Sequence, residues 1–256
     1  MKIKIFLLTV ISLYSFSARS QTLAEQLGYP AETKLLIIHA DDLGVSHSVN
    51  EASIKALQKG VVNSASIMIP CPWFFEIAEF AKQNPQFDLG LHLTLTSEWK
   101  NYKWGPLTSY DLVSSLLDST NYFPDNIEAV GKNANLAQVE LELDQQIRRA
   151  FKYGINPSHI DAHMGAAFST PELTKIYIKL AHKYKLVAFL PKIILQNFTD
   201  FNYQSFLTKQ DVIVDNVIML PDLDAYKFQE EFYNNHIKKI LPGSLNVLLL
   251  HAGFDD

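Results

Sequence analysis

The pattern of hydrophobic and polar positions predicts short buried strands that alternate with amphipathic helices. Residues 35–38 form a continuous apolar run, as expected for a strand buried on both faces. Residues 136–152 carry apolar side chains at helical spacing, between a capping residue, Asn135, and Gly154. The same reasoning predicts strands at 35–38, 65–69, 89–95, 158–162, 186–190, 212–220 and 245–250, and helices at 48–59, 73–82, 136–152, 171–184 and 224–239.

Repeated strand–helix units predict a parallel sheet covered by helices, either open and doubly wound or closed into a barrel. No Gly-x-Gly-x-x-Gly motif follows the first strand, where a dinucleotide-binding sheet would need it. An acidic pair, Asp41-Asp42, stands there instead. Barrel enzymes carry their polar site residues at the C-terminal ends of strands. We therefore expect an α/β fold, an irregular (β/α) barrel, with residues 21–256 as one domain.

The first 20 residues have the features of a secretory signal peptide. Lys2 and Lys4 precede an apolar run over 5–14, and Ala18 and Ser20 are small residues at the spacing of a cleavage site. A membrane anchor is the alternative, but the run is shorter than the roughly 20 residues that a span needs. We expect residues 1–20 to be removed and the protein to be exported, periplasmic or secreted, with no membrane association afterwards.

Composition excludes several classes of protein. Among 256 residues there is one cysteine, Cys71, so neither an intramolecular disulfide nor a Cys-rich zinc module can form. The formal net charge is -5 and no basic block is present, which argues against a nucleic-acid partner.

Polar residues recur where the predicted strands end, and they suggest metal chemistry. A carboxylate and two imidazoles from different strands make a three-ligand metal site with open positions, which can activate water or polarise a carbonyl. An iron(II) oxygenase uses the same ligand types but usually takes the first His and the carboxylate from one short motif, which this chain lacks. The polar clusters are Asp41-Asp42, Asp88 with His92, residues 159–163, and His251.

Several ordered motifs resemble those of the YdjC-like carbohydrate deacetylases, the chito-oligosaccharide deacetylase family. Residues 40–44 are similar to that family's Ala-Asp-Asp-Phe-Gly, and Asn50 stands at a similar spacing to its Asn. The likeness runs from about Lys34 to the C-terminus. The remaining similar segments are 60–68 (Gly-Ile-Val-Thr-Ser in the family), 89–96 (Gly-x-His-x-x-Leu-Thr), 157–163 (Pro-Thr-His-Leu-Asp-Ser-His) and 250–254 (His-Pro-Gly-Tyr).

The resemblance implies an irregular barrel of the glycoside hydrolase/deacetylase type that removes acetate from N-acetylated sugars. Carried over by position, Asp42, His92 and His163 would bind one divalent metal ion, either Mg or Zn. Asp41 would be the general base, and His251 the general acid. Asp41 and Asp42 are adjacent, so in an extended strand they would face opposite ways, and both can serve one site only if the chain turns there. Gly44 makes such a turn plausible.

Other residues are expected to support the site. Asp161 could accept the second N–H of an imidazole ligand, and His159 and Asn50 are candidates for support or substrate contact. Trp104, with Trp99 and Tyr102, would either stack on a sugar ring or form a small satellite core. His39 is expected in the core or behind the ligands. The expected partner is an N-acetylated glycan, and a homodimer is left open.

Three departures from the family pattern concern the substrate and the end of the chain. Met164-Gly165-Ala166 follow His163 where relatives often have more histidines, and Ala188 and Phe189 stand where they often have an Arg. Relatives continue past the position of His251 into another helix, so the domain is expected to be short at its C-terminus. The alternatives are another metallohydrolase, such as a phosphoesterase, on the same residues, or a non-catalytic glycan-binding barrel.

Overall fold

The computed structural model describes residues 21–198, 202–208, 211–220 and 229–254. The expected signal peptide, residues 1–20, lies outside them. Among the described helices, none is long and apolar enough to cross a membrane.

A parallel sheet of eight strands forms the centre of the molecule, in the order β6-β5-β4-β3-β2-β1-β8-β7. β1 and β8 are its longest pair, with six residues in register from Leu35 opposite Leu245 to Ala40 opposite Leu250. The strands are β1 (Leu35–Leu43), β2 (Ser64–Ile67), β3 (Leu89–Leu93), β4 (His159–Ala162), β5 (Val187–Pro191), β6 (Val212–Val214), β7 (Asn216–Ile218) and β8 (Leu245–Leu250).

The two outermost strands nearly close this sheet into a barrel. Only Asp215 separates β6 from β7, so the two are halves of one extended run. The first half pairs with β5 and the second with β8. The predicted α/β barrel is therefore confirmed, and the strand expected at 212–220 is divided at Asp215.

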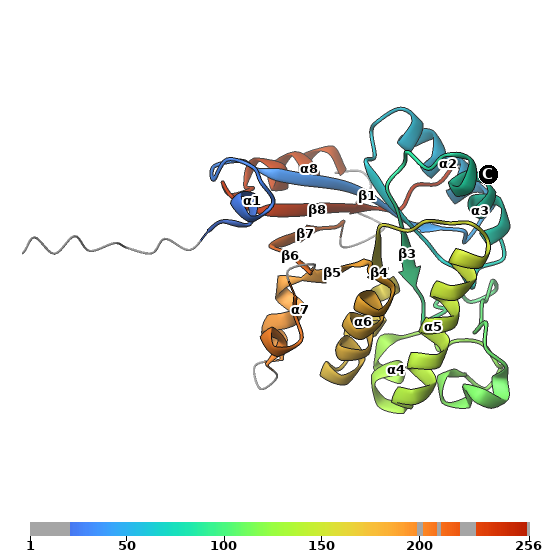
Figure 1. Ribbon diagram of the computed structural model, residues 1–256. Coiled ribbons are helices and arrows are strands. Elements are labelled where there is room, and N and C mark those ends of the chain that lie inside the picture. Colours follow the sequence, from blue (N-terminus) through green and yellow to red (C-terminus); the bar gives the residue numbers. More distant parts are fainter. Residues whose placement is uncertain (1–20, 199–201, 209–210, 221–228, 255–256) are drawn as a thin grey trace, which may run out of the picture.

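Helices cover the outside of the barrel (Figure 1). The helix α5 agrees with the prediction residue for residue, and the Asn135 side chain accepts hydrogen bonds from the backbone N–H groups of Ala137 and Gln138. α4 was not predicted because its short sequence has no clear periodicity. The predicted 224–239 helix is observed as α8, and residues 221–228 lie outside the described chain. The helices are α1 (Leu23–Gln26), α2 (His47–Gln58), α3 (Phe74–Gln83), α4 (Ile127–Asn133), α5 (Leu136–Lys152), α6 (Pro171–Tyr184), α7 (Lys192–Asn197) and α8 (Gln229–Lys238).

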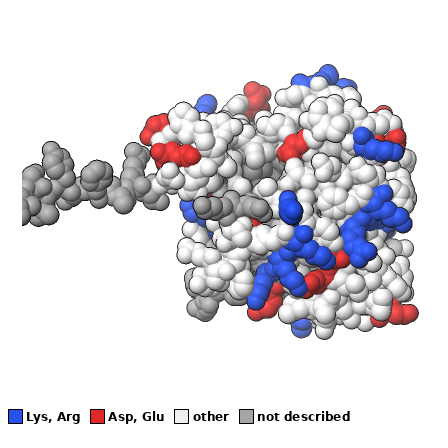
Figure 2. All heavy atoms as spheres, in the orientation of Figure 1, with Lys and Arg blue, Asp and Glu red and all other residues white. Residues whose placement is uncertain are grey.

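The outer faces of α5 and α6 carry charges of both signs. Figure 2 shows Lys and Arg side chains gathered over this part of the surface with Asp and Glu beside them. Lys179 Nζ lies 2.6 Å from Glu140, and Lys183 Nζ lies 2.5 Å from Asp144. Lys179 and Lys183 on α6 are thus paired with acidic groups of α5.

Candidate active site

The chain turns at the end of β1, as the paired carboxylates require. Asp42 has a φ of 68°, in the left-handed region, and the register between β1 and β2 shifts between Ala40 and Leu43. Asn50 stabilises the turn because its Oδ1 accepts a hydrogen bond from the Gly44 N–H at 2.6 Å. Its Nδ2 donates to the Trp73 carbonyl and to Glu76, and the residue is fully buried. Asn50 therefore acts on the backbone of the turn and is not available to a substrate.

Three expected ligands meet at the C-terminal end of the barrel. His163 Nδ1 lies 3.2 Å from Asp42 Oδ1, and His92 Nε2 lies 3.4 Å from the same oxygen. The His92 and His163 side chains are each 4% exposed, and that of Asp42 is 17% exposed. These three groups could hold a metal ion.

In each imidazole, the outer nitrogen faces away from Asp42 and the inner nitrogen faces Asp42. The hydrogen bond of the outer nitrogen determines the protonation of the inner one. His92 Nδ1 lies 2.7 Å from Asp161 Oδ1, and His163 Nε2 lies 3.0 Å from Glu98 Oε2. When the outer nitrogens donate to these carboxylates, the inner nitrogens of the neutral rings carry lone pairs toward Asp42. Asp42 Oδ1 is buried and has no hydrogen-bond partner. Two lone pairs and an unpartnered carboxylate oxygen converge, so the donor set fits a divalent cation.

Without a cation, the charges of this cluster would be balanced by protons. Burial favours neutral Asp42, but His163 and His92 outweigh it and hold the pKa of the carboxyl well below its usual range. Burial also opposes protonation of His92, yet the neighbouring carboxylates, Asp161 first, raise its pKa well above the ordinary value. A bound cation would replace those protons, so metal binding is expected to release them.

Asp41 lies beside the cluster and is held by His39. Its Oδ1 is 3.1 Å from His39 Nε2 and 3.4 Å from Ser66 Oγ, and the residue is 5% exposed. His39 Nε2 also lies 3.0 Å from Asp161 Oδ2, while its Nδ1 is 2.9 Å from Ser64 Oγ. His39 thus connects the expected base to the carboxylate that orients His92, a role more specific than the sequence indicated.

The protonation of His39 predicts a pH-dependent stability in the cation-free protein. Burial lowers the pKa of His39, but hydrogen bonds with Asp161 and Asp41 outweigh it and raise the pKa to about 9. Because the pKa is raised on folding, the stabilisation is complete below about pH 6.5 and is lost as the pH rises through about 9. We expect His39 to account for a fall of roughly 3 kcal/mol in the unfolding free energy across this window.

Urea unfolding of the chelated protein at several pH values measures this fall. His39→Asn should flatten the profile by that amount, whereas His236→Asn on α8 should leave it unchanged. A profile that is equally steep in His39→Asn would show that His39 is not a stabilising cation.

The remaining predicted residues divide between the mouth and the interior of the site. His251 is 48% exposed in its side chain, and its Nε2 lies 3.8 Å from Asp42 Oδ2, so it can meet a substrate. Ser48 Oγ exchanges hydrogen bonds with the Phe254 backbone, which ties the segment after β8 to α2. His159 packs against His39, with ring centroids 5.3 Å apart, and is not part of the three-ligand cluster.

The aromatic residues after β3 form a small core with one exposed member. Trp104 is 2% exposed, donates from Nε1 to the Thr96 carbonyl, and packs edge-on to His163 at 6.0 Å. It therefore cannot stack on a sugar ring and instead positions an imidazole. Trp99 is 42% exposed and contacts Trp104. Of the two interpretations of this cluster, the satellite core holds for Trp104, and a stacking surface remains open to Trp99.

Sequence reasoning missed Glu98. Its signal was weak, since it is a single carboxylate five residues beyond the end of β3 at Leu93. Only the fold brings it to His163, which comes from another strand.

The geometry defines an α/β barrel with an acidic–histidine cluster at the C-terminal ends of its strands. The family model described as YdjC-like protein matches residues 35–256, and the chain belongs to this family. A carbohydrate deacetylase of Thermus thermophilus is 39% identical over 170 residues, which cover 66% of this chain and 58% of the relative. A carbohydrate deacetylase of Enterococcus faecalis is 35% identical over 199 residues, covering 77% of this chain and 70% of the relative.

A solved structure from Enterococcus faecalis shares the fold of this chain. It is a protein of Enterococcus faecalis V583 to which cellobiose-phosphate cleavage is ascribed. The TM-score is 0.71 with 27% identity, over 88% of this chain and 83% of that chain. The matched part spans less than two thirds of the length of the Thermus relative.

Proposed function

We propose that this chain is a metal-dependent hydrolase that removes acetyl groups from N-acetylated sugars or oligosaccharides. The observation that carries the proposal is the convergence of two imidazole nitrogens on a buried, unpartnered oxygen of Asp42. The similarity to relatives named carbohydrate deacetylases supports the substrate class.

Asp42, His92 and His163 would hold one divalent ion, either zinc, which imidazole ligands suit, or magnesium. When bound, such an ion polarises an acetamide carbonyl and lowers the pKa of an attacking water. Glu98 and Asp161 orient the two imidazoles through hydrogen bonds of 3.0 Å and 2.7 Å. Their carboxylates make the ligand nitrogens more basic and fix the tautomer of each ring.

Two further residues would move protons during hydrolysis. Asp41 accepts a proton from the attacking water, and the oxygen of that water forms a bond to the acetyl carbon. The bond from that carbon to the sugar nitrogen then breaks, and His251 Nε2 supplies a proton to the leaving amine. Acetate and a free amino sugar are the products. The partly exposed position of His251 and the buried position of Asp41 place acid and base in different surroundings.

A panel of potential substrates tests the proposed class. Purified protein, loaded with zinc or magnesium, is incubated with N-acetylglucosamine, its β-linked oligomers and a set of sugar phosphates. We expect acetate and amine in equal amounts from at least one N-acetylated sugar, and no phosphate. Phosphate release without acetate would identify a phosphoesterase, and binding of glycans without any product would identify a non-catalytic barrel.

We also propose that the protein is exported after removal of residues 1–20, because Ala18 and Ser20 fit a cleavage site before Gln21. Mass spectrometry of the protein recovered from outside the cytoplasm should give Gln21 as its first residue. An exported form that retains residues 1–20 would contradict this.

A further inference from the structure

The barrel contains a cavity at the end opposite the three-ligand cluster. Its volume is about 580 Å³, and none of Asp42, His92 and His163 lines it. The first residues of four strands border it, namely Leu35, Val187, Val212 and Leu245. The cavity therefore opens where the strands begin, whereas the candidate active site lies where they end.

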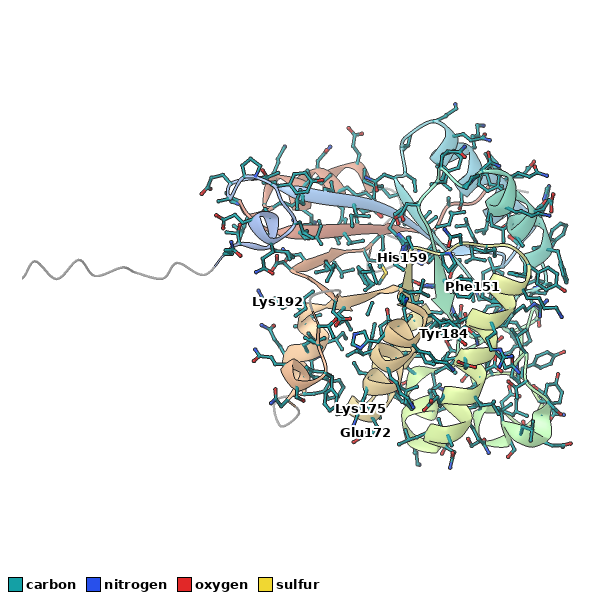
Figure 3. All side chains as sticks on the ribbon, viewed as in Figure 1. Phe151, His159, Glu172, Lys175, Tyr184 and Lys192 are labelled. Carbon is teal, nitrogen blue, oxygen red and sulfur yellow. The ribbon has the colours of Figure 1, made fainter. Side chains whose placement is uncertain are left out.

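Small inward-facing residues on two strands leave this space. Barrel interiors are normally filled by layers of large side chains, but β2 and β3 contribute Ser64 and Gly90 here. The His159 imidazole occupies part of the room beside Gly90, where a Cβ would collide with its Nε2. Figure 3 shows His159 at the centre of the molecule. The rest of the space stays open.

The walls of the cavity are predominantly apolar. Val187 is 37% exposed although β5 is paired on both sides, and several neighbours are also only partly buried. A volume of a few hundred Å³ with apolar walls and a few converging polar groups is typical of small-molecule sites. The apolar lining includes Leu35, Ile37, Phe189, Val212, Val247 and Leu249.

The opening of the cavity, where the strands begin, offers hydrogen-bond acceptors. Ser158 Oγ lies 2.5 Å from Asp88 Oδ1 and 2.8 Å from His159 Nδ1. When the hydroxyl donates to the carboxylate, it accepts from the Nδ1–H, so His159 Nε2 carries a lone pair. Within the described part of the chain, that Nε2 has no hydrogen-bond partner and lies against Gly90. Burial, followed by the nearby His39, lowers the pKa of His159 and keeps the ring neutral.

Deeper in the cavity, the buried His39 and Ser64 are already hydrogen-bonded. Both nitrogens of His39 already face oxygen atoms, and Ser64 Oγ is bonded to one of them. Asp88 and Asp161 also line the cavity. Asp161 is already paired with His39 and His92, whereas Asp88 at the opening accepts a hydrogen bond only from Ser158 among the contacts above, so the opening favours a cation that donates hydrogen bonds over an anion.

We propose that this cavity binds a small amphipathic amine, with its apolar body against the β1, β5, β6 and β8 side chains and its ammonium group at the Asp88 carboxylate. The cavity borders His39 and Asp161, which support the proposed deacetylase centre, but none of Asp42, His92 and His163 lines it, and the proposal does not depend on that activity.

Calorimetric titration of the metal-loaded protein with phenylbutylamine tests the proposal, with phenylpentanoate as the anion of matching shape. We expect the amine to bind at least about tenfold more tightly than the carboxylate, as expected for one charge-assisted hydrogen bond. Asp88→Asn should weaken amine binding roughly tenfold, whereas Asp111→Asn, an exposed carboxylate in a 3-10 turn, should not change it.

Ile37→Trp, which fills the cavity, should abolish binding of both probes. Thermal unfolding shows whether each variant is folded. If Ile37→Trp does not fold, the amine affinity of Asp88→Asn tests the proposal instead. Equal affinity for amine and carboxylate, or amine binding that Asp88→Asn leaves unchanged, would overturn the proposal. Asp41→Asn should lack deacetylase activity and still bind the amine as the wild type does. Amine binding is therefore tested independently of the proposed hydrolysis.

Discussion

Replacing Asp41 with Asn is expected to lower kcat by about 10²–10⁴-fold while leaving the fold and the metal content unchanged. Asn is nearly isosteric and can still accept a hydrogen bond from His39 Nε2, which lies 3.1 Å from the Asp41 carboxylate. It cannot take a proton from water. The loss should therefore fall on kcat, with little change in KM.

The rate comparison requires equal metal occupancy in wild type and variant, measured by elemental analysis. Asp111→Asn is the matched control, because it removes an exposed carboxylate that is not part of the cluster and should keep full activity. If Asp41→Asn hydrolyses substrate at the rate of the wild type, Asp41 serves only to stabilise the turn and another group is the base.

Loss of an imidazole ligand is expected to remove the metal ion itself. Wild-type protein should hold about one divalent ion per chain, and His92→Ala combined with His163→Ala should reduce this to near zero with complete loss of hydrolysis. The physical reason is that Asp42 would be left as a single carboxylate ligand. His39 would still bond to Asp41 and Asp161, so we expect the barrel to remain folded.

Elemental analysis after dialysis measures the metal content, and His236→Ala on α8 is the control for removing a histidine elsewhere. A double variant that retains one ion per chain would place the metal outside the Asp42, His92 and His163 cluster.

Much of the fold was predictable because buried parallel strands and amphipathic helices leave different patterns. The apolar run that begins β1 and the helical spacing of α5 each identify their element without tertiary information. The division at Asp215 was not predictable, since it depends on β6 pairing with β5 while β7 pairs with β8. The short helix α4 has too few turns to show a period.

The site was predictable where a residue stands in a motif at the end of a strand, as Asp42, His92 and His163 do. Contacts across the barrel were not. His39 and Asp161 lie 122 positions apart in the chain, yet His39 Nε2 and Asp161 Oδ2 are 3.0 Å apart. Burial also decided the role of Trp104, because an aromatic residue near a site can stack on a ligand only if its face is exposed.

Acetate release before and after metal removal tests the central claim most directly. Protein stripped by a chelator and then restored with a stoichiometric divalent ion is assayed on the best N-acetylated sugar from the panel. The account predicts no acetate from the stripped protein and recovery of equal acetate and amine once the ion is restored. Acetate release that survives metal removal, or its absence from every N-acetylated sugar at full metal occupancy, would contradict it.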